Sequence, residues 1–83
     1  MTRTKIKHFN PQTKIQYSIP KKARVKLEIF NTNGQMVALL VDEVQLPGRY
    51  DKMFNASMLP GGVYFYKIQA DELSQSAKML LIK

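Results

Sequence analysis

The 83-residue sequence has no cysteine and no tryptophan, and only one histidine, His8. Without cysteine, the chain can form neither a disulfide framework nor a thiolate zinc site, and it offers no cysteine nucleophile. A single histidine excludes a metal site built from several imidazoles. No apolar run reaches the length of about 18 residues that a transmembrane helix needs. We therefore expect no metal, no cofactor and no transmembrane segment.

Acidic residues are scarce, and their positions bear on catalysis. Six Asp and Glu stand against 13 Lys and Arg, which gives a formal net charge of +7. The pairs Asp42-Glu43 and Asp71-Glu72 fall at predicted turns, whereas a catalytic pair must face across a cleft. No helix is predicted after Gly61-Gly62, so these glycines are not expected to bind phosphate. The residues predict a protein that is not an enzyme.

A basic domain of this kind could bind nucleic acid, anionic lipid or an acidic polysaccharide. No RNP-like motif and no basic helix is present, so the sequence does not favour nucleic acid. The basic residues are spread along the chain, with a small cluster at Lys21-Lys22 and Arg24. A solvated charge shell accounts for most of them, and docking on an anionic cell-surface component remains the functional alternative.

Turn signals divide the chain at regular intervals, among them Asn33-Gly34, Pro47-Gly48 and Pro60-Gly61-Gly62. Short segments between regular turns are typical of an all-β sandwich or barrel. The segments predict an all-β antiparallel β-sandwich of about seven strands, at residues 13–19, 24–31, 35–44, 49–55, 62–70 and 73–83, with a short one near Phe9.

Alternating apolar residues predict which side chains face the core. Strand 13–19 places Ile15, Tyr17 and Ile19 on one face, and strand 24–31 does the same with Val25, Leu27 and Ile29. Four further residues are expected to point inward: Tyr50, Phe54, Met79 and Leu81.

Residues 36–41 form a continuous apolar run, which predicts a bulged central strand covered on both faces, with a short helix as the alternative. The final strand is expected to have an exposed edge, and its Lys78 and Lys83 are expected to be exposed to solvent.

A series of motifs occurs in order along most of the chain. Phe9-Asn10-Pro11 with residues 13–20 is similar to FNPxTxIxYxLP, and residues 25–37 are similar to VxLxIYdxxGxxV. Residues 46–50 match xxGxY, residues 54–67 resemble W-[DN]-A-S-x-L-x-x-G-V-Y-F-Y-[KR], and residues 78–83 resemble KMxLxK. Together these motifs resemble the type A C-terminal sorting domain of type IX secretion cargo. That family is similar to the immunoglobulin-like domain of the flagellar hook-capping protein.

The resemblance implies an immunoglobulin-like β-sandwich over residues 9–83, with residues 1–8 as an N-terminal extension. The family's upstream NPF is replaced here by residues 5–8, and Phe54 stands where Trp is common. Met1–His8 is basic but has no apolar h-region, so an export signal is expected upstream of this chain.

The resemblance also implies a function. It implies a non-catalytic module that directs an exported cargo through the periplasm of a Gram-negative bacterium to the cell surface. The implied partners are the upstream cargo domain, the outer-membrane type IX translocon and a sortase-like peptidase. An exposed edge strand would also allow a weak dimer.

The recognition residues predicted for this role come from the turns and the tail: Pro47, Gly48, Tyr50, Gly62, Tyr64, Lys78 and Lys83. Turns and a core also need most of these residue types, so a structural role is the alternative for each. Two other functions stay open. One is an accessory module that binds polysaccharide through aromatic and lysine side chains, and the other is a structural domain that binds a surface protein.

Overall fold

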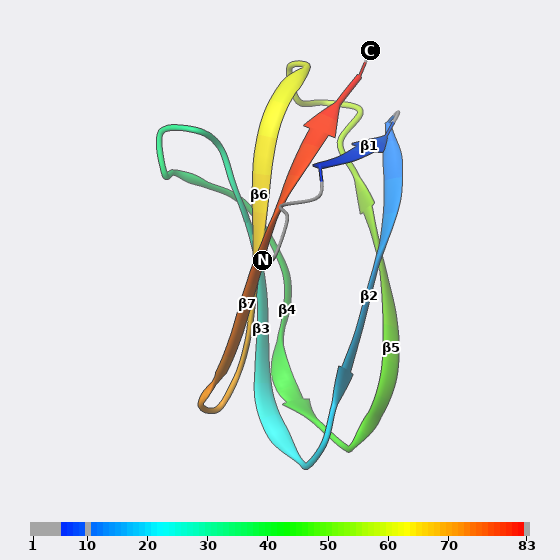
Figure 1. Cartoon of the computed structure of the whole chain (residues 1–83), viewed down its shortest axis with the longest axis vertical. Coiled ribbons are helices and arrows are strands. Elements are labelled where there is room, and N and C mark those ends of the chain that lie inside the picture. The colour runs from blue at the N-terminus through cyan, green and yellow to red at the C-terminus, as the bar shows by residue number, and fades with distance from the viewer. Residues whose placement is uncertain (1–5, 10, 83) are drawn as a thin grey trace, which may run out of the picture.

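The strands of the protein form two sheets of unequal size (Figure 1). The computed structural model describes residues 6–9 and 11–82. The strands in this part of the chain are β1 (Ile6–Phe9), β2 (Gln12–Ile19), β3 (Ala23–Phe30), β4 (Met36–Gln45), β5 (Gly48–Asn55), β6 (Gly62–Ala70) and β7 (Leu73–Leu81). The predicted all-β sandwich of about seven strands is confirmed, including the short strand near Phe9.

One sheet has five strands in the order β1-β7-β6-β3-β4, and the other pairs β2 with β5. Every pair is antiparallel except β1 with β7, which run parallel from Ile6 opposite Lys78 to Phe9 opposite Leu81. After β1 the chain crosses to the smaller sheet as β2. The parallel pair departs from the purely antiparallel prediction.

The pairing with β1 also corrects the prediction of an exposed final strand. Residues 78–81 of β7 are paired with β1 on one side and with β6 on the other. That stretch is therefore internal to the sheet and offers no free edge to a second chain.

The core lies between the two sheets and is made by the alternating residues that the sequence indicated. Val25, Leu27 and Ile29 on β3 are fully buried, as is Met79 on β7. Other core side chains follow the same period-two pattern on their strands, among them Ile15, Ile19, Phe54, Ile68 and Leu81. At roughly 25 cal/mol for each Å² of apolar area removed from water, this layer supplies the main favourable contribution to folding.

Tyr50 also points inward as predicted, but it is only half-buried. Its ring stacks on that of Tyr17, with centroids 5.4 Å apart and planes 17° from parallel. The two residues are directly opposite each other on β5 and β2. Both rings pack against the core from the two-stranded sheet.

Strand β4 differs from its prediction. It is the edge strand of the five-stranded sheet rather than a central strand, and it is not a helix. The bulges are present: its register against β3 shifts between Leu27 and Glu28 and again between Ile29 and Phe30. Because each bulge inserts an extra residue, strict alternation fails and an apolar run no longer implies cover on both faces.

The connections gather at two ends of the sandwich (Figure 1). We call "lower end" the turns at residues 20–22, 46–47 and 71–72, and "upper end" the connections at residues 31–35 and 56–61. The predicted hairpin turn at the upper end is confirmed: Asn31 Oδ1 accepts hydrogen bonds from the amides of Asn33 and Gln35. Gly34 adopts φ 79° there, which the side chains of most residues disfavour.

Candidate recognition surfaces

The predicted recognition residues do not meet at one place. Three lie at the lower end, two at the upper end and one on the outer face of the five-stranded sheet: Pro47, Gly48 and Tyr50; Gly62 and Tyr64; and Lys78. Lys83 falls outside the residues that the structure describes. These residues therefore belong to at least three separate surfaces.

At the lower end, Pro47 and Gly48 make the turn between β4 and β5. Both are exposed, and Gly48 adopts φ 149°. The Tyr50 hydroxyl donates a hydrogen bond of 2.6 Å to the carbonyl oxygen of Leu46, four residues earlier. This bond ties the first residues of β5 back to the end of β4.

At the upper end, the turn into β6 is built in the same way. Gly62 adopts φ 142°, and the Tyr64 hydroxyl donates a 2.7 Å hydrogen bond to the carbonyl oxygen of Pro60, again four residues earlier. The Tyr64 ring is 5% exposed and belongs to the core. The pattern resembles the tyrosine corner of immunoglobulin-like sandwiches, in which a hydroxyl bonds to the backbone a few residues upstream.

The two turns explain why a glycine stands two residues before a tyrosine in both segments. A positive φ at the glycine sends the chain into the strand, and the tyrosine then closes the turn through its hydroxyl. Pro47, Gly48, Tyr50, Gly62 and Tyr64 thus have clear structural roles. Of these five residues, only Pro47 and Gly48 are exposed.

Lys78 is half-buried rather than exposed, which corrects the sequence-based expectation. It lies on β7 directly opposite Phe65 of β6, on the sheet face that points away from the core. Its ammonium nitrogen sits 5.9 Å from the centre of the Phe65 ring. A cation over an aromatic ring at this distance is attracted by the ring's quadrupole.

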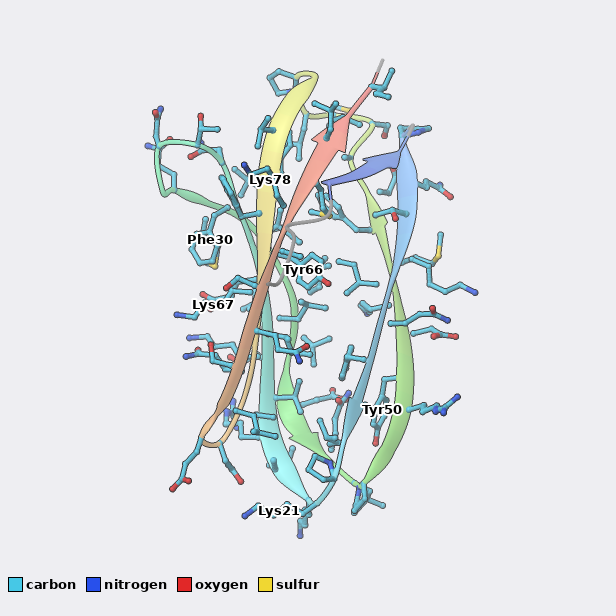
Figure 2. All side chains as sticks on the ribbon, in the orientation of Figure 1. Lys21, Phe30, Tyr50, Tyr66, Lys67 and Lys78 are labelled. Atoms are coloured by element: carbon cyan, nitrogen blue, oxygen red, sulfur yellow. The ribbon has the colours of Figure 1, made fainter. Side chains whose placement is uncertain are left out.

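Sequence reasoning missed the apolar surface around Lys78. Neighbouring strands place Met36, Phe30, Phe65 and Lys78 opposite one another in a single row across the outer face. We call "outer apolar patch" the side chains of this row and the apolar residues next to it: Phe30, Met36, Leu39, Val63, Phe65 and Leu80. Figure 2 shows Phe30, Lys67 and Lys78 on this side, whereas Tyr66 points between the sheets.

The two bulges of β4 create the most exposed part of this patch. Val37, Ala38 and Leu40 pack against the core, while Met36 and Leu39 point outward, 51% and 45% exposed. Met36 lies opposite Phe30, and Leu39 lies opposite Glu28. The predicted bulge was the signal in the sequence for this surface, because the bulges place Met36, Leu39 and Asp42 on the outer face at a spacing of three residues.

A polar network lies beside the Tyr17–Tyr50 stack. The Tyr17 hydroxyl donates a 2.8 Å hydrogen bond to Gln45 Oε1, and Gln45 Nε2 donates to Glu43. Burial raises the pKa of the Tyr17 phenol, and nearby Tyr50 and Glu43 act in the same direction. The hydrogen bond to Gln45 opposes this shift. Each of the two stacked rings covers one face of the other.

Across residues 11–82, no three acidic side chains come together in a way that could hold a metal ion. No helix in this part is long and apolar enough to cross a membrane. Arg24 forms a 2.8 Å ion pair with Asp42, but both side chains are exposed, and such pairs contribute little to stability.

Comparisons with solved structures support the fold. A protein of Bacillus anthracis str. Ames, described as uncharacterized, superposes with a TM-score of 0.59 at 12% identity, covering 89% of this chain and 75% of that one. The ZIG-8–RIG-5 IG1–IG1 heterodimer gives a TM-score of 0.51 at 9% identity, with coverage of 98% and 84%. At these identities the likeness concerns the fold alone, which is immunoglobulin-like.

A comparison with curated proteins found no match. A family model described as "Secretion system C-terminal sorting domain" matches residues 9–83, which is most of the chain. The match covers every strand from β2 to β7, both Gly-x-Tyr turns and Lys78. The chain therefore belongs to the family of type IX secretion C-terminal sorting domains, and it has the immunoglobulin-like fold.

Proposed function

We propose that this chain directs an exported cargo protein, carried on its N-terminal side, through the type IX machinery to the cell surface. The observation that carries the proposal is the family match over residues 9–83. The domain acts without catalysis, as a folded label that the outer-membrane translocon recognises after the cargo reaches the periplasm. A sortase-like peptidase then separates it from the cargo, upstream of the matched residues.

Two features support recognition of the folded domain rather than of a loose peptide. The predicted recognition residues of the turns are held by the tyrosine hydroxyl bonds and by the core. The last strand is paired on both sides near its end. A receptor that reads these residues therefore meets a preformed surface, which saves the ordering cost that a disordered segment carries on binding.

The experiment fuses the whole 83-residue chain to the C-terminus of a periplasmic reporter in a host with type IX secretion. We expect the reporter at the cell surface, and in the periplasm of a matched strain that lacks the translocon. Protease resistance of the fused domain shows whether it has folded. A folded domain whose reporter stays in the periplasm of the competent host would falsify the proposal.

Deletion of residues 78–83 is a poor test, because it removes Met79 and Leu81 from the core. Point substitutions that leave the core intact are cleaner.

The polysaccharide-binding alternative gains less from the structure. Among the described aromatic rings, the stacked pair is Tyr17 with Tyr50, and each ring covers one face of the other. The protein-binding alternative fits the outer apolar patch, and it does not conflict with the sorting function, because a sorting domain must itself bind a protein.

A further inference from the structure

We infer that the outer apolar patch is the surface through which this domain docks on a protein partner. The partner's contact surface should carry an apolar strip edged by carboxylates. The inference deepens the proposed function and rests on it in one respect: the expected partner is an outer-membrane component of the type IX machinery. None of the turn residues discussed above takes part.

The first argument is the composition and exposure of the patch. Phe30 and Phe65 lie opposite each other on β3 and β6, with Met36 beyond Phe30 on the edge strand. Both rings are half-buried on a face that no other layer of the described chain covers. Aromatic residues and methionine are enriched at the centres of protein interfaces. Exposed patches of this kind on small domains commonly mark interaction sites.

The second argument is the way the patch ends. Toward the lower end the same sheet face becomes charged, with Glu28 opposite Lys67 and Lys26 opposite Asp42. On β7, the Lys78 ammonium lies over the Phe65 ring and borders the apolar centre. An apolar centre with a polar rim is the usual anatomy of a protein interface.

The charges of the rim favour a protein over an anionic membrane. Asp42 engages Arg24 in an ion pair, and Glu28 faces Lys67 across the strands, so much of the positive charge on this face has an acidic neighbour. Attraction to anionic lipid depends on clustered basic residues, each worth about 1 kcal/mol near the surface. Lys78 borders the apolar centre through its contact with Phe65, and a carboxylate at the edge of the partner's apolar strip suits it.

The test uses two methionines that differ in position but not in exposure. Met36 is 51% exposed within the patch, and Met53 is 52% exposed on the outer face of the smaller sheet, opposite Lys14. Met36→Glu and Met53→Glu therefore add the same charge at equally accessible sites. We expect both to keep the melting temperature within about 4 °C of the wild type, as surface substitutions do.

In the reporter fusion of the whole chain, Met36→Glu should reduce surface delivery roughly ten-fold or more, because a charge enters the centre of the contact. Met53→Glu should leave delivery unchanged. Lys78→Glu should also reduce it, whereas Lys78→Arg, which keeps the cation over Phe65, should not. Equal delivery by Met36→Glu and wild type, with both folded, overturns the inference.

Photo-crosslinking separates this inference from the proposed function. A benzophenone side chain at position 36 should give an adduct that mass spectrometry assigns to an outer-membrane component of the type IX machinery, and position 53 should not. Such an adduct without export supports the docking surface while the sorting function fails. Export without an adduct at position 36 overturns the docking surface alone, and the absence of both rejects both.

Two other partners have their own readouts. Sedimentation of the chain with phosphatidylglycerol vesicles that is lost in Met36→Glu but kept in Met53→Glu would assign the patch to a membrane. A dimer of the wild-type chain in analytical ultracentrifugation that Met36→Glu dissociates would assign it to self-association. Either result overturns the inference of a different protein as partner.

Discussion

The turns that lead into β5 and β6 use the same local device in two different surroundings. In both, a glycine with positive φ (149° at Gly48, 142° at Gly62) precedes a tyrosine by two residues, and the hydroxyl bonds to a carbonyl four residues back. Tyr64 is buried in the core, whereas Tyr50 is half-buried and rests on Tyr17. Local geometry thus sets the turn, and the surroundings set how much stability depends on it.

Removal of the tyrosine rings should show the largest difference in stability between the two turns. We expect Tyr64→Ala to lower the free energy of unfolding by about 3–5 kcal/mol, because a large cavity opens in a thin core. Tyr50→Ala should cost only about 1–3 kcal/mol, since water already reaches part of that ring. Urea unfolding of the two variants and the wild type measures the difference. Equal losses would mean that Tyr50 contributes to the core as much as Tyr64 does.

The two glycines should behave alike. A Cβ built on Gly48 or Gly62 meets no atom within 4 Å, so the cost of Gly48→Ala or Gly62→Ala is backbone strain alone. We expect each substitution to lower the free energy of unfolding by roughly 1–3 kcal/mol. Gly61→Ala is the matched control, because Gly61 is not among the glycines with positive φ. A clearly larger loss at one of the two sites would show that the turns are not equivalent.

The smallest expected effect is a pH dependence of stability that comes from the phenol of Tyr17, the ring stacked on Tyr50. Burial raises the pKa of Tyr17 in the folded protein above the unfolded value of about 10. The unfolded state therefore loses its proton first, and stability should fall as pH rises above about 10. In Tyr17→Phe this decline should be shallower, although the loss of the Gln45 hydrogen bond lowers stability at every pH. Thermal unfolding from pH 8 to 11 measures both slopes, and parallel slopes would contradict the assignment to Tyr17.

Much of the fold could be predicted because period-two alternation and turn chemistry are local signals. The burial of Val25, Leu27 and Ile29 follows from alternation alone, and the hairpin at Asn31 follows from its turn residues. The position of β4 could not be predicted in this way. Strand order depends on which segments pair at long range, and the two bulges hide the alternation that marks an edge strand.

The candidate site was harder to predict than the fold. Motif residues such as Tyr50 and Tyr64 stand out in the sequence, but their hydroxyl bonds also give them a structural role in the turns, so the motif alone does not mark a recognition site. The outer apolar patch joins residues from β4, β3, β6 and β7, and only the register brings Met36, Phe30 and Phe65 into one row. Among the predicted residues that the structure describes, Lys78 alone lies at this surface, and its contact with Phe65 depends on cross-strand pairing.

The placement of β7 between β1 and β6 has a mechanical consequence. A force applied at Leu81 along the strand would load the bonds to both neighbours at once, in shear, instead of opening them one after another. Antiparallel pairing on one side and parallel pairing on the other make the two ladders respond differently to the same pull. A machine that grips this domain by its last strand would therefore drag the sandwich as a rigid body before it extracts the strand.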